Sequence, residues 1–357
     1  MARDLELIAD ALDEIDREPL FRRSWQPVDL TPVLEGSWEA PEPTVGRRSD
    51  GVGLFYPGKL HTVSSESEGG KTWFALSVVL DELIRDHHVV YLDFEDDEGG
   101  IVGRLLTLGA DRETIRNRFH YLRPEDPLGT GIHADDLREL LDAYRPTLAV
   151  VDGVTEALTM HGLNPNDNSD VAAFGRILPR RLSAAGCASV ALDHVTKSTE
   201  SRGRYSIGAV HKLNGLDGAA YVLENRKPFG VGITGRSTVR IAKDRPGQLR
   251  KSALPSSGGM FWAGDLVLTS HAEGFTEIEV MAPEERQGDG FRPTVYMGRI
   301  MAAINEHGPL SKRMLRTAVT GRAATIDEAL NRLILDGYLT ESTPHSKLKE
   351  WIVDDQV

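Results

Sequence analysis

The stretch "TVSSESEGGKTW", residues 62–73, decides the fold class, because it joins an apolar strand pattern to an amphipathic helix pattern. Its end, Gly70-Lys71-Thr72, is the end of a phosphate-binding loop of the form G-x-x-x-x-G-K-[ST]. Ser65 occupies the position of the first glycine, and Glu66 and Glu68 add two carboxylates to a loop that would hold phosphate.

Backbone N–H groups and a helix N-terminus hold the phosphates in such loops, so the variable side chains can point away from them. Lys71 can reach the β- and γ-phosphates, and the Thr72 hydroxyl can ligate Mg²⁺. Ser65 puts the loop geometry in question, since glycine makes such a turn more easily. We predict an ATP site formed by Ser67, Glu68, Gly69, Gly70, Lys71, Thr72 and Trp73.

Strand and helix patterns alternate on both sides of this loop, which predicts an α/β fold with a mostly parallel sheet. Apolar strands are expected at "KLHTVSS", "HHVVYLDFE", "RFHYLRP", "TLAVVDG" and "ASVALDH". Asp152 ends one of them, where a second carboxylate would hold Mg²⁺ through water. One long helix is expected over "SDVAAFGRILPRRLSAAG", starting near Ser169 and Asp170, and the strands after it are expected to be mostly antiparallel.

Shifts in composition divide the chain into four segments. Residues 1–50 read as an N-terminal arm or linker, 51–280 as the ATPase domain, and 281–293 as a polar linker. Residues 294–357 contain three helix patterns followed by a two-stranded pattern, which is typical of a winged helix-turn-helix domain. Thr325 and Glu328 suggest a capping box at the start of the third helix.

Composition excludes several classes of protein. The first twenty residues mix charges throughout, unlike a signal peptide, and no stretch approaches the ~20 apolar residues that span a membrane. Cys187 is the one cysteine, which excludes disulfides and fits a reducing cytoplasm, and the eleven histidines are scattered. A net charge of −13 argues against a surface coated to bind nucleic acid, but it leaves room for a local basic groove.

The order of "SESEGGKT", "VVYLDFEDD", "TLAVVDG", "VALDHVTKS" and "VRIAKDRPG" resembles the RecA-like ATPases, and within them the RepA-type branch of hexameric replicative helicases. The resemblance covers roughly residues 50–255. It implies that Glu95 orients the attacking water and that His194 senses the γ-phosphate. Lys71, assigned from the loop motif, would act with them as a catalytic residue. The resemblance also implies that Lys243 and Arg245 reach into the site of a neighbouring subunit.

The segment after His194 is the strongest candidate for DNA contact. In the RecA-like fold this loop faces the central channel of a ring, and here it carries four cations between Gly and Ser residues, which suits contact with a nucleic-acid backbone. We expect Lys197, Arg202, Arg204 and Lys212 to bind single-stranded DNA. The winged helix would bind either DNA or a protein partner.

The sequence therefore predicts an ATP- and Mg²⁺-dependent motor on single-stranded DNA, assembled as a homo-oligomer, most simply a hexameric ring. Three alternatives stay open. They are a RecA-like recombinase that forms filaments, an ATP-switched DNA-binding regulator, and a partner-dependent ATPase without unwinding activity. Stimulation of hydrolysis by single-stranded DNA, together with strand displacement, separates the motor from the regulator.

Overall fold

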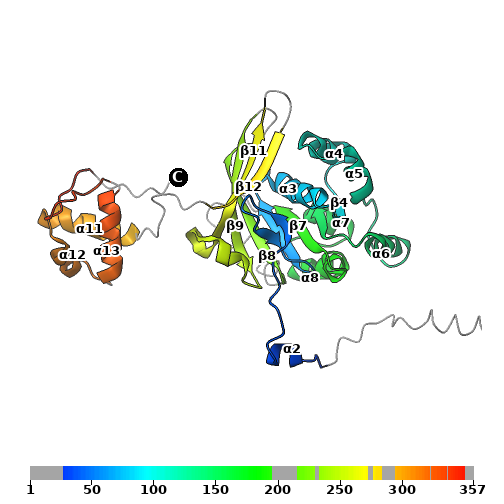
Figure 1. Cartoon of the computed structure of the whole chain (residues 1–357), viewed down its shortest axis with the longest axis horizontal. Coiled ribbons are helices and arrows are strands. Elements are labelled where there is room, and N and C mark those ends of the chain that lie inside the picture. Colours follow the sequence, from blue (N-terminus) through cyan, green and yellow to red (C-terminus); the bar gives the residue numbers. More distant parts are fainter. Residues whose placement is uncertain are drawn as a thin grey trace, which may run out of the picture.

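The computed structural model describes residues 27–194, 215–229, 233–271, 276–283, 294–321, 323–335 and 337–349. Its larger folded part is built on a ten-stranded sheet in the order β10-β11-β9-β8-β3-β7-β6-β4-β5, with β12 paired to β11 (Figure 1). The strands span β3 Leu60–Ser65, β4 Val89–Asp93, β5 Phe119–Leu122, β6 Leu148–Asp152, β7 Ala188–His194, β8 Ala219–Lys227, β9 Gly235–Asp244, β10 Leu254–Pro255, β11 Phe261–Ser270 and β12 Thr276–Met281.

Strands β8, β3, β7, β6, β4 and β5 run parallel to one another. Strand β9 pairs antiparallel with β8, and β9 to β12 extend the sheet with further antiparallel pairs. This confirms the predicted mixed α/β class with a mostly parallel sheet. Successive residues of the central strands face opposite sides, as strand geometry requires. In β4, for example, Val89 and Tyr91 enter one core cluster and Val90 and Leu92 the other.

Helices cover both faces of the parallel strands. One core cluster holds α3 Lys71–Ile84, α4 Glu98–Thr107 and α5 Arg112–Arg118 against the sheet. The opposite cluster holds α6 Ile132–Tyr144, α7 Val154–Met160, α8 Asn168–Ile177 and α9 Pro179–Ala184. Buried on both faces, the strands need to be almost wholly apolar, which explains runs such as "LAVV" in β6.

The expected long helix is two helices. Pro179 interrupts it, since proline lacks an N–H and its ring clashes with the preceding turn, but it suits the first position of a new helix. Accordingly α8 ends at Ile177 and α9 starts at Pro179. The helix also starts slightly earlier than expected, at Asn168. Asp167 is its N-cap, and the Asp167 carboxylate accepts hydrogen bonds from the N–H groups of Ser169 and Asp170.

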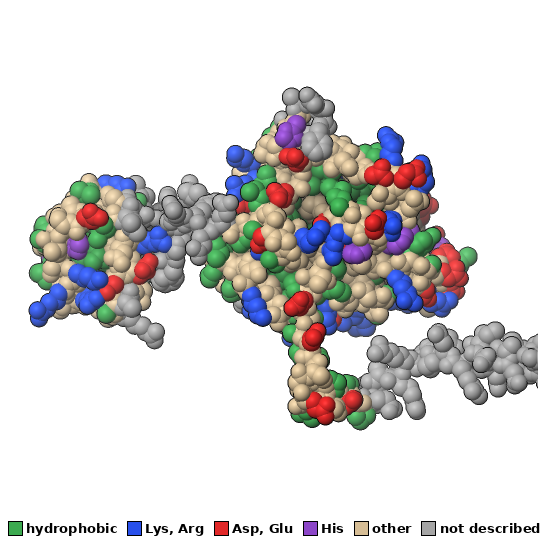
Figure 2. Space-filling model, in the orientation of Figure 1, with side chains coloured by type: hydrophobic (Ala, Val, Ile, Leu, Met, Phe, Trp, Pro, Cys, Tyr) green, Lys and Arg blue, Asp and Glu red, His purple; other side chains and the backbone are tan. Residues whose placement is uncertain are grey.

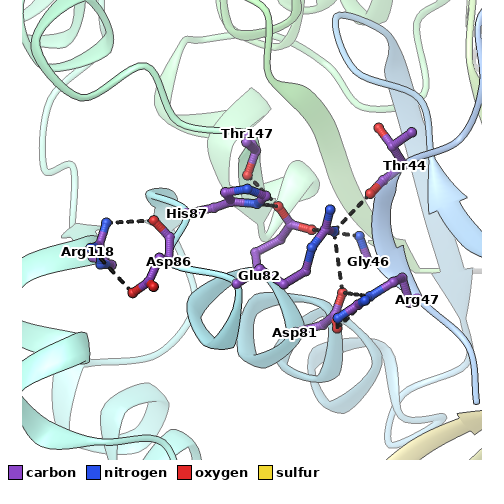
Figure 3. Close-up of polar contacts among 10 residues, drawn as sticks. Thr44, Gly46, Arg47, Asp81, Glu82, Asp86, His87, Arg118 and Thr147 are labelled. Atoms are coloured by element: carbon purple, nitrogen blue, oxygen red, sulfur yellow. Dashed lines mark hydrogen bonds and ion pairs between the residues drawn. The ribbon is translucent and has the colours of Figure 1, made fainter. Parts of the chain in front are cut away.

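The domain begins before residue 51. Strands β1 Val45–Arg47 and β2 Gly53–Phe55 form an antiparallel hairpin, and β1 packs on α3. Figure 3 shows how Glu82, near the end of α3, joins these parts: its carboxylate accepts from Gly46 N at 2.9 Å and from Thr147 Oγ1 at 2.5 Å. Arg85 and His87 contact the same carboxylate at 3.0 and 2.7 Å. Ahead of β1 lies one short helix, α2 Thr31–Leu34.

A second, smaller core lies near the C-terminus. Helices α11 Thr294–His307, α12 Lys312–Ala318 and α13 Ala323–Leu335 enclose a cluster drawn from residues 296–339. The prediction of a capping box at Thr325 is wrong, because α13 begins at Ala323 and Thr325 lies within the helix. Where a two-stranded wing was expected, the described residues have isolated bridges, Leu310 with His345 and Leu339 with Lys347. Across the described ranges, no helix is long and apolar enough to cross a membrane.

Candidate ATP site

The carboxyl ends of four neighbouring parallel strands meet at one edge of the sheet. In register, Ser65 at the end of β3 lies opposite His194 at the end of β7, and Asp93 of β4 lies opposite Asp152 of β6. Ligands of open α/β sheets bind outside the carboxyl ends of the strands. The predicted phosphate loop, metal ligand and sensor thus converge at the edge where such a ligand would lie.

Ser65 fits at its position because the residues of the loop with positive φ angles are others. Ser65 is the last residue of β3, and the positive φ angles are at Glu68 (62°) and Gly70 (92°). The Ser65 hydroxyl donates to the Glu66 carbonyl at 2.7 Å, and a Cβ on Gly69 would lie 2.5 Å from that hydroxyl oxygen. A serine therefore fits at the first position because Gly69 has no side chain. Glu66, Ser67 and Glu68 are exposed, whereas Gly69, Gly70 and Lys71 are buried.

Lys71, the first residue of α3, is a buried cation beneath this loop. Its side chain is only 8% exposed, and burial lowers its pKa while Glu95, Asp152 and other carboxylates oppose that change. Its ammonium lies 3.2 Å from His194 Nδ1 and 3.5 Å from the Ser65 hydroxyl. Within the described ranges no carboxylate forms a salt bridge with it. A cation held in this way is suited to an arriving phosphate.

Thr72 and Asp152 lie together, as a metal site requires. The Thr72 hydroxyl donates to Asp152 Oδ2 at 3.3 Å, and the Tyr91 hydroxyl donates to the same oxygen at 2.5 Å. Burial raises the pKa of Asp152, while the Tyr91 hydrogen bond, Lys71 and Thr72 favour its ionised form. A hydroxyl and a carboxylate of this kind are the oxygen donors that Mg²⁺ takes at a phosphate. No described group of three or more His, Cys, Asp or Glu could hold a metal without such a phosphate.

Glu95 follows β4 and faces His194 across the site, with Oε1 3.4 Å from His194 Nε2. Burial raises the pKa of Glu95 to about 7, helped by a hydrogen bond with Glu156 and by the charges of Asp152 and Glu156. Burial also lowers the pKa of His194, together with the charge of Lys71. Gly153 leaves room for Glu95 and Glu156 to lie close together, because a Cβ at position 153 would lie 2.7 Å from Glu95 Cγ and 3.3 Å from Glu156 Oε2.

Asp93 is buried two residues before Glu95, but its oxygens are already occupied. Oδ1 accepts from the N–H groups of Glu95 and Asp96 at 3.0 and 2.8 Å, and Oδ2 accepts from the Tyr121 hydroxyl at 2.9 Å. Asp93 therefore shapes the turn that presents Glu95. Between these two carboxylates, Glu95 is the one available to a water molecule.

Strands β8 and β9 support the phosphate loop with residues that sequence reasoning missed. Ser237 Oγ donates to the Gly69 carbonyl at 2.9 Å, and Asn225 Nδ2 donates to the Glu68 carbonyl at 3.3 Å. The Phe229 ring lies over Gly70, where a Cβ would approach it to 2.6 Å. These residues follow the loop by more than 150 positions and belong to no local motif, so only the sheet order reveals them. Glu156 was missed as well; its place on α7, four residues after Asp152, is the signal that could have found it.

Lys243 and Arg245 do not join the site within one chain. Asp244 pairs with Ala219 at the amino end of β8, and β8 runs parallel to β3, so the end of β9 lies at the edge opposite the phosphate loop. Lys243 Nζ donates to the Leu216 carbonyl at 3.0 Å, and burial lowers its pKa. Arg245 is exposed in the turn that follows. Any role at a phosphate must therefore be played in another copy of the chain.

The four expected DNA-binding residues, Lys197, Arg202, Arg204 and Lys212, lie outside the described residues. Their role stays a prediction from the sequence. The nearest described positions are His194, at the carboxyl edge, and Gly215, which accepts a hydrogen bond from Arg180 Nη2 at 2.8 Å.

One family model covers the part of the chain that forms this site. A family model described as an AAA domain matches residues 26–200, which include the phosphate loop, Glu95, Asp152 and His194. No protein of curated function matches the chain. A solved structure titled a KaiC-like protein from the hyperthermophilic archaeon Pyrococcus horikoshii OT3 matches with a TM-score of 0.46 and 12% identity, over 67% of this chain and 98% of that one. The family match covers slightly less than half of the chain, and together with the sheet order and the loop it indicates an α/β nucleotide-binding fold of the P-loop kind.

Proposed function

We propose that this chain is an ATP-hydrolysing motor that works on single-stranded DNA as a ring helicase or translocase of the RepA type. The observation that carries the proposal is the convergence of Lys71, Glu95 and His194 at one strand edge, while Arg245 lies at the opposite edge. In this proposal each chain supplies the phosphate loop, the metal ligands and Glu95, while Arg245, at the opposite edge of the sheet, would serve a neighbouring copy.

Each residue of the site has a distinct part in phosphoryl transfer, which depends on positioning and electrostatic stabilisation more than on covalent chemistry. Lys71 would contact the β- and γ-phosphate oxygens, and Glu95 would orient the attacking water. His194, bonded to both, would report the presence of the γ-phosphate. Thr72 and Asp152 would hold Mg²⁺, which supplies charge neutralisation on the phosphate oxygens.

Assembly follows from the separation of the two edges. Arg245 can approach a phosphate only if the amino edge of one sheet faces the carboxyl edge of the next copy. Such head-to-tail contacts close into rings when their rotation allows it. A hexamer with DNA in a central channel, contacted by the segment that contains Arg202 and Arg204, is the arrangement that we propose.

The C-terminal helices favour a second candidate function, a partner-dependent ATPase without unwinding activity. We propose a winged-helix module here, and its cations are partly engaged: Lys312 and Arg316 on α12 pair with Asp327, and Arg332 on α13 is buried. Arg313 on α12 is exposed. The face of α13 therefore suits a protein partner, whereas α12 keeps an exposed cation for DNA.

Hydrolysis and strand displacement separate the two functions. A motor should hydrolyse ATP faster when single-stranded DNA is added and should displace a strand from a forked duplex. The Glu95→Gln protein, assayed in parallel, should bind ATP but do neither. Stimulation by DNA without displacement favours the partner-dependent ATPase, and an ATPase indifferent to DNA contradicts the motor.

A further inference from the structure

The turn that carries Arg245 is hydrogen-bonded from inside the domain. It spans residues 245–248, between the end of β9 and a short 3-10 helix, Leu249–Ser252. Arg245 is exposed, whereas Asp244 just before the turn is 5% exposed and Leu249 just after it is 4% exposed. Both ends of the turn are therefore fixed in the core, with the arginine at the surface between them.

The Asp244 carboxylate accepts hydrogen bonds from the chain beyond Arg245. Its Oδ1 accepts from Gly247 N at 3.0 Å, and its Oδ2 accepts from Arg250 N at 3.3 Å. Arg245 N donates to the Gly218 carbonyl at 3.0 Å, which ties the backbone of the arginine to the segment ahead of β8. Gly247 has a φ angle of 85°, which glycine adopts without strain. These contacts close a tight turn directly after Arg245.

Tyr56, which follows β2, reaches the same turn from a distant part of the chain. The residue is fully buried, and its hydroxyl oxygen accepts from the N–H groups of Gln248 and Leu249, both at 3.1 Å. The hydroxyl itself donates to Asp244 Oδ1 at 2.8 Å. Burial raises the pKa of Tyr56, and the hydrogen bond to Asp244 raises it further, so the phenol keeps its proton. One hydroxyl thus uses its donor and both of its acceptor sites on the chain that flanks Arg245.

Tyr56 is itself held by β3. His61 is fully buried, and its Nδ1 accepts from Ala219 N at 3.0 Å, so the ring proton lies on Nε2, which donates to the Tyr56 carbonyl at 3.0 Å. Burial lowers the pKa of His61 to about 4, which keeps the ring neutral and preserves this arrangement. The two rings stack, with their centroids 5.9 Å apart and their planes 10° apart. A buried polar network whose members are all satisfied is rigid, so the phenol is a fixed support for the turn.

Position matters more for Arg245 than a broad positive field does. Figure 2 shows Lys and Arg side chains interspersed with acidic ones on one face of the larger folded part, and those drawn in colour there do not gather into one basic patch. An arginine supplied to a neighbouring copy stabilises the transition state only if its guanidinium lies at the phosphate oxygens. A misplacement of about 1 Å can lower a rate by roughly 10²-fold.

We propose that Tyr56 is a positioning residue for Arg245: its hydroxyl, together with the Asp244 carboxylate, holds the turn that presents the guanidinium to a neighbouring copy. The inference rests on the proposed function, in which Arg245 acts between copies. The hydrogen bonds of Tyr56 lie at the amino edge of the sheet, whereas Ser65 ends β3 at the carboxyl edge. Loss of the hydroxyl should therefore spare the phosphate loop of the same chain.

Tyr56→Phe removes this hydroxyl and little else. We expect kcat for ATP to fall by roughly 10- to 10²-fold, because the turn is no longer fixed, while equilibrium ATP binding stays unchanged. Gly247→Ala should have the same effect without disturbing the core, since a Cβ there meets nothing within 4 Å but the φ angle of 85° becomes strained. A folded Tyr56→Phe protein with normal kcat overturns the proposal. If Tyr56→Phe does not fold, Gly247→Ala replaces it in every assay.

Tyr221→Phe is the matched control. Tyr221 is also fully buried, and its hydroxyl donates to the Leu54 carbonyl at 2.6 Å, away from the turn. We expect this variant to lose thermal stability, as Tyr56→Phe does, but to keep kcat. A loss of kcat in Tyr221→Phe equal to that in Tyr56→Phe would mean that both act by weakening the fold, which also overturns the proposal.

A mixing experiment shows in which copy Tyr56 acts. Lys71→Ala has a defective phosphate loop but an intact Tyr56 and Arg245, so in mixed assemblies it should serve the intact loop of a Tyr56→Phe neighbour. Hydrolysis by the mixture should rise severalfold above the mean of the two proteins measured alone, whereas general damage to the fold of Tyr56→Phe would give no rise. Arg245→Ala mixed with Lys71→Ala is the parallel control, and labelled protein follows subunit exchange.

The two mixtures separate failure of this inference from failure of the proposed function. Rescue of Arg245→Ala without rescue of Tyr56→Phe means that Tyr56 acts within its own copy, which overturns the inference alone. Rescue of neither, despite exchange, contradicts the shared ATP site of the proposed function, and the inference fails with it.

Discussion

A buried charged side chain lies near each end of α3, and the two differ in how closely hydrogen-bonding partners surround them. At its first residue, the Lys71 ammonium is 8% exposed, and its nearest polar contacts are 3.2 and 3.5 Å away. Three turns later, the Glu82 carboxylate is fully buried and accepts four contacts between 2.5 and 3.0 Å, from Gly46, Arg85, His87 and Thr147 (Figure 3).

The difference separates a structural charge from a functional one. A buried charge is costly unless hydrogen bonds and opposite charges compensate it. Glu82 is compensated within the protein, so it fastens the first strands to the P-loop helix. Lys71 is not, and Glu95 and Asp152 nearby have raised pKa values. Groups left in this state are typical of a site that a charged ligand completes.

The largest expected effect tests whether the N-terminal end of α3 is completed by a second copy. Arg245→Ala should bind ATP, assemble and lose hydrolysis by on the order of 10³-fold, as for an arginine supplied between subunits. Steady-state ATPase and nucleotide-binding assays measure this. Arg226→Ala is the control, because that arginine is exposed on β8 and pairs with Glu224.

A mixture sharpens this result. Lys71→Ala should also be inactive, but combined with Arg245→Ala it should regain activity, since some intact loops would then face an intact Arg245. Subunit exchange is followed separately with labelled protein. Hydrolysis that stays at the level of the two single variants, despite exchange, means that the sites are not shared.

The second prediction concerns the water-orienting carboxylate. Glu95→Gln should retain ATP binding and lower kcat by roughly 10²- to 10⁴-fold, the range for a positioned general base. Equilibrium binding and single-turnover hydrolysis distinguish the two steps. Normal turnover would assign the role elsewhere, and Asp93→Asn would then be examined, although Asp93 is engaged by three donors.

The third prediction concerns the other end of the helix. Glu82→Ala leaves four donors without their buried acceptor, which should lower the free energy of unfolding by about 3 kcal/mol. Chemical denaturation measures the loss. Glu113→Ala, whose ion pair with Arg116 is exposed, should change stability by less than about 1 kcal/mol. Equal losses for the two variants would contradict the structural role of Glu82.

Local patterns predicted much of the fold and site. Strand alternation and the loop motif gave the sheet class, the start of α3 and the meeting of Lys71, Thr72 and Asp152, because each depends on neighbouring residues or on strand ends. The apolar periodicity on both sides of Pro179 predicted one continuous helix, although a proline at that position ends one helix and begins the next.

Contacts between segments that are distant in the sequence could not be predicted from local patterns. Ser237 and Phe229 support the phosphate loop only because β8 and β9 continue the sheet beyond β3, and no local pattern encodes that order. The same holds for Glu82, which reads as a surface residue of an amphipathic helix until β1 and Thr147 pack on it. Glu156 needed the turn at Gly153 to bring it to Glu95.

The smallest expected effect concerns that last pair and the pH at which the site works. In the proposed mechanism the carboxylate form of Glu95 orients the attacking water, and its pKa of about 7 predicts that kcat/KM for ATP falls as the pH drops through 7. Below that value the fall should approach tenfold per pH unit. Rates measured from pH 5.5 to 8.5, at constant ionic strength, give the profile.

Glu156→Gln gives a sharper test, because it should raise activity at low pH, whereas most substitutions in an active site lower activity. The Glu156 carboxyl raises the pKa of Glu95 through both a hydrogen bond and its charge. Without that charge the pKa should fall, and a fall of about one unit would increase the ionised fraction of Glu95 at pH 6 roughly five-fold. The variant should therefore be a few-fold more active than the parent at pH 6 and equal to it at pH 8. Glu113→Gln, far from the site, should keep the parental profile. An acid limb that does not move in Glu156→Gln would mean that Glu95 titrates independently of its neighbour, and that burial alone sets the pH at which it can accept the water proton.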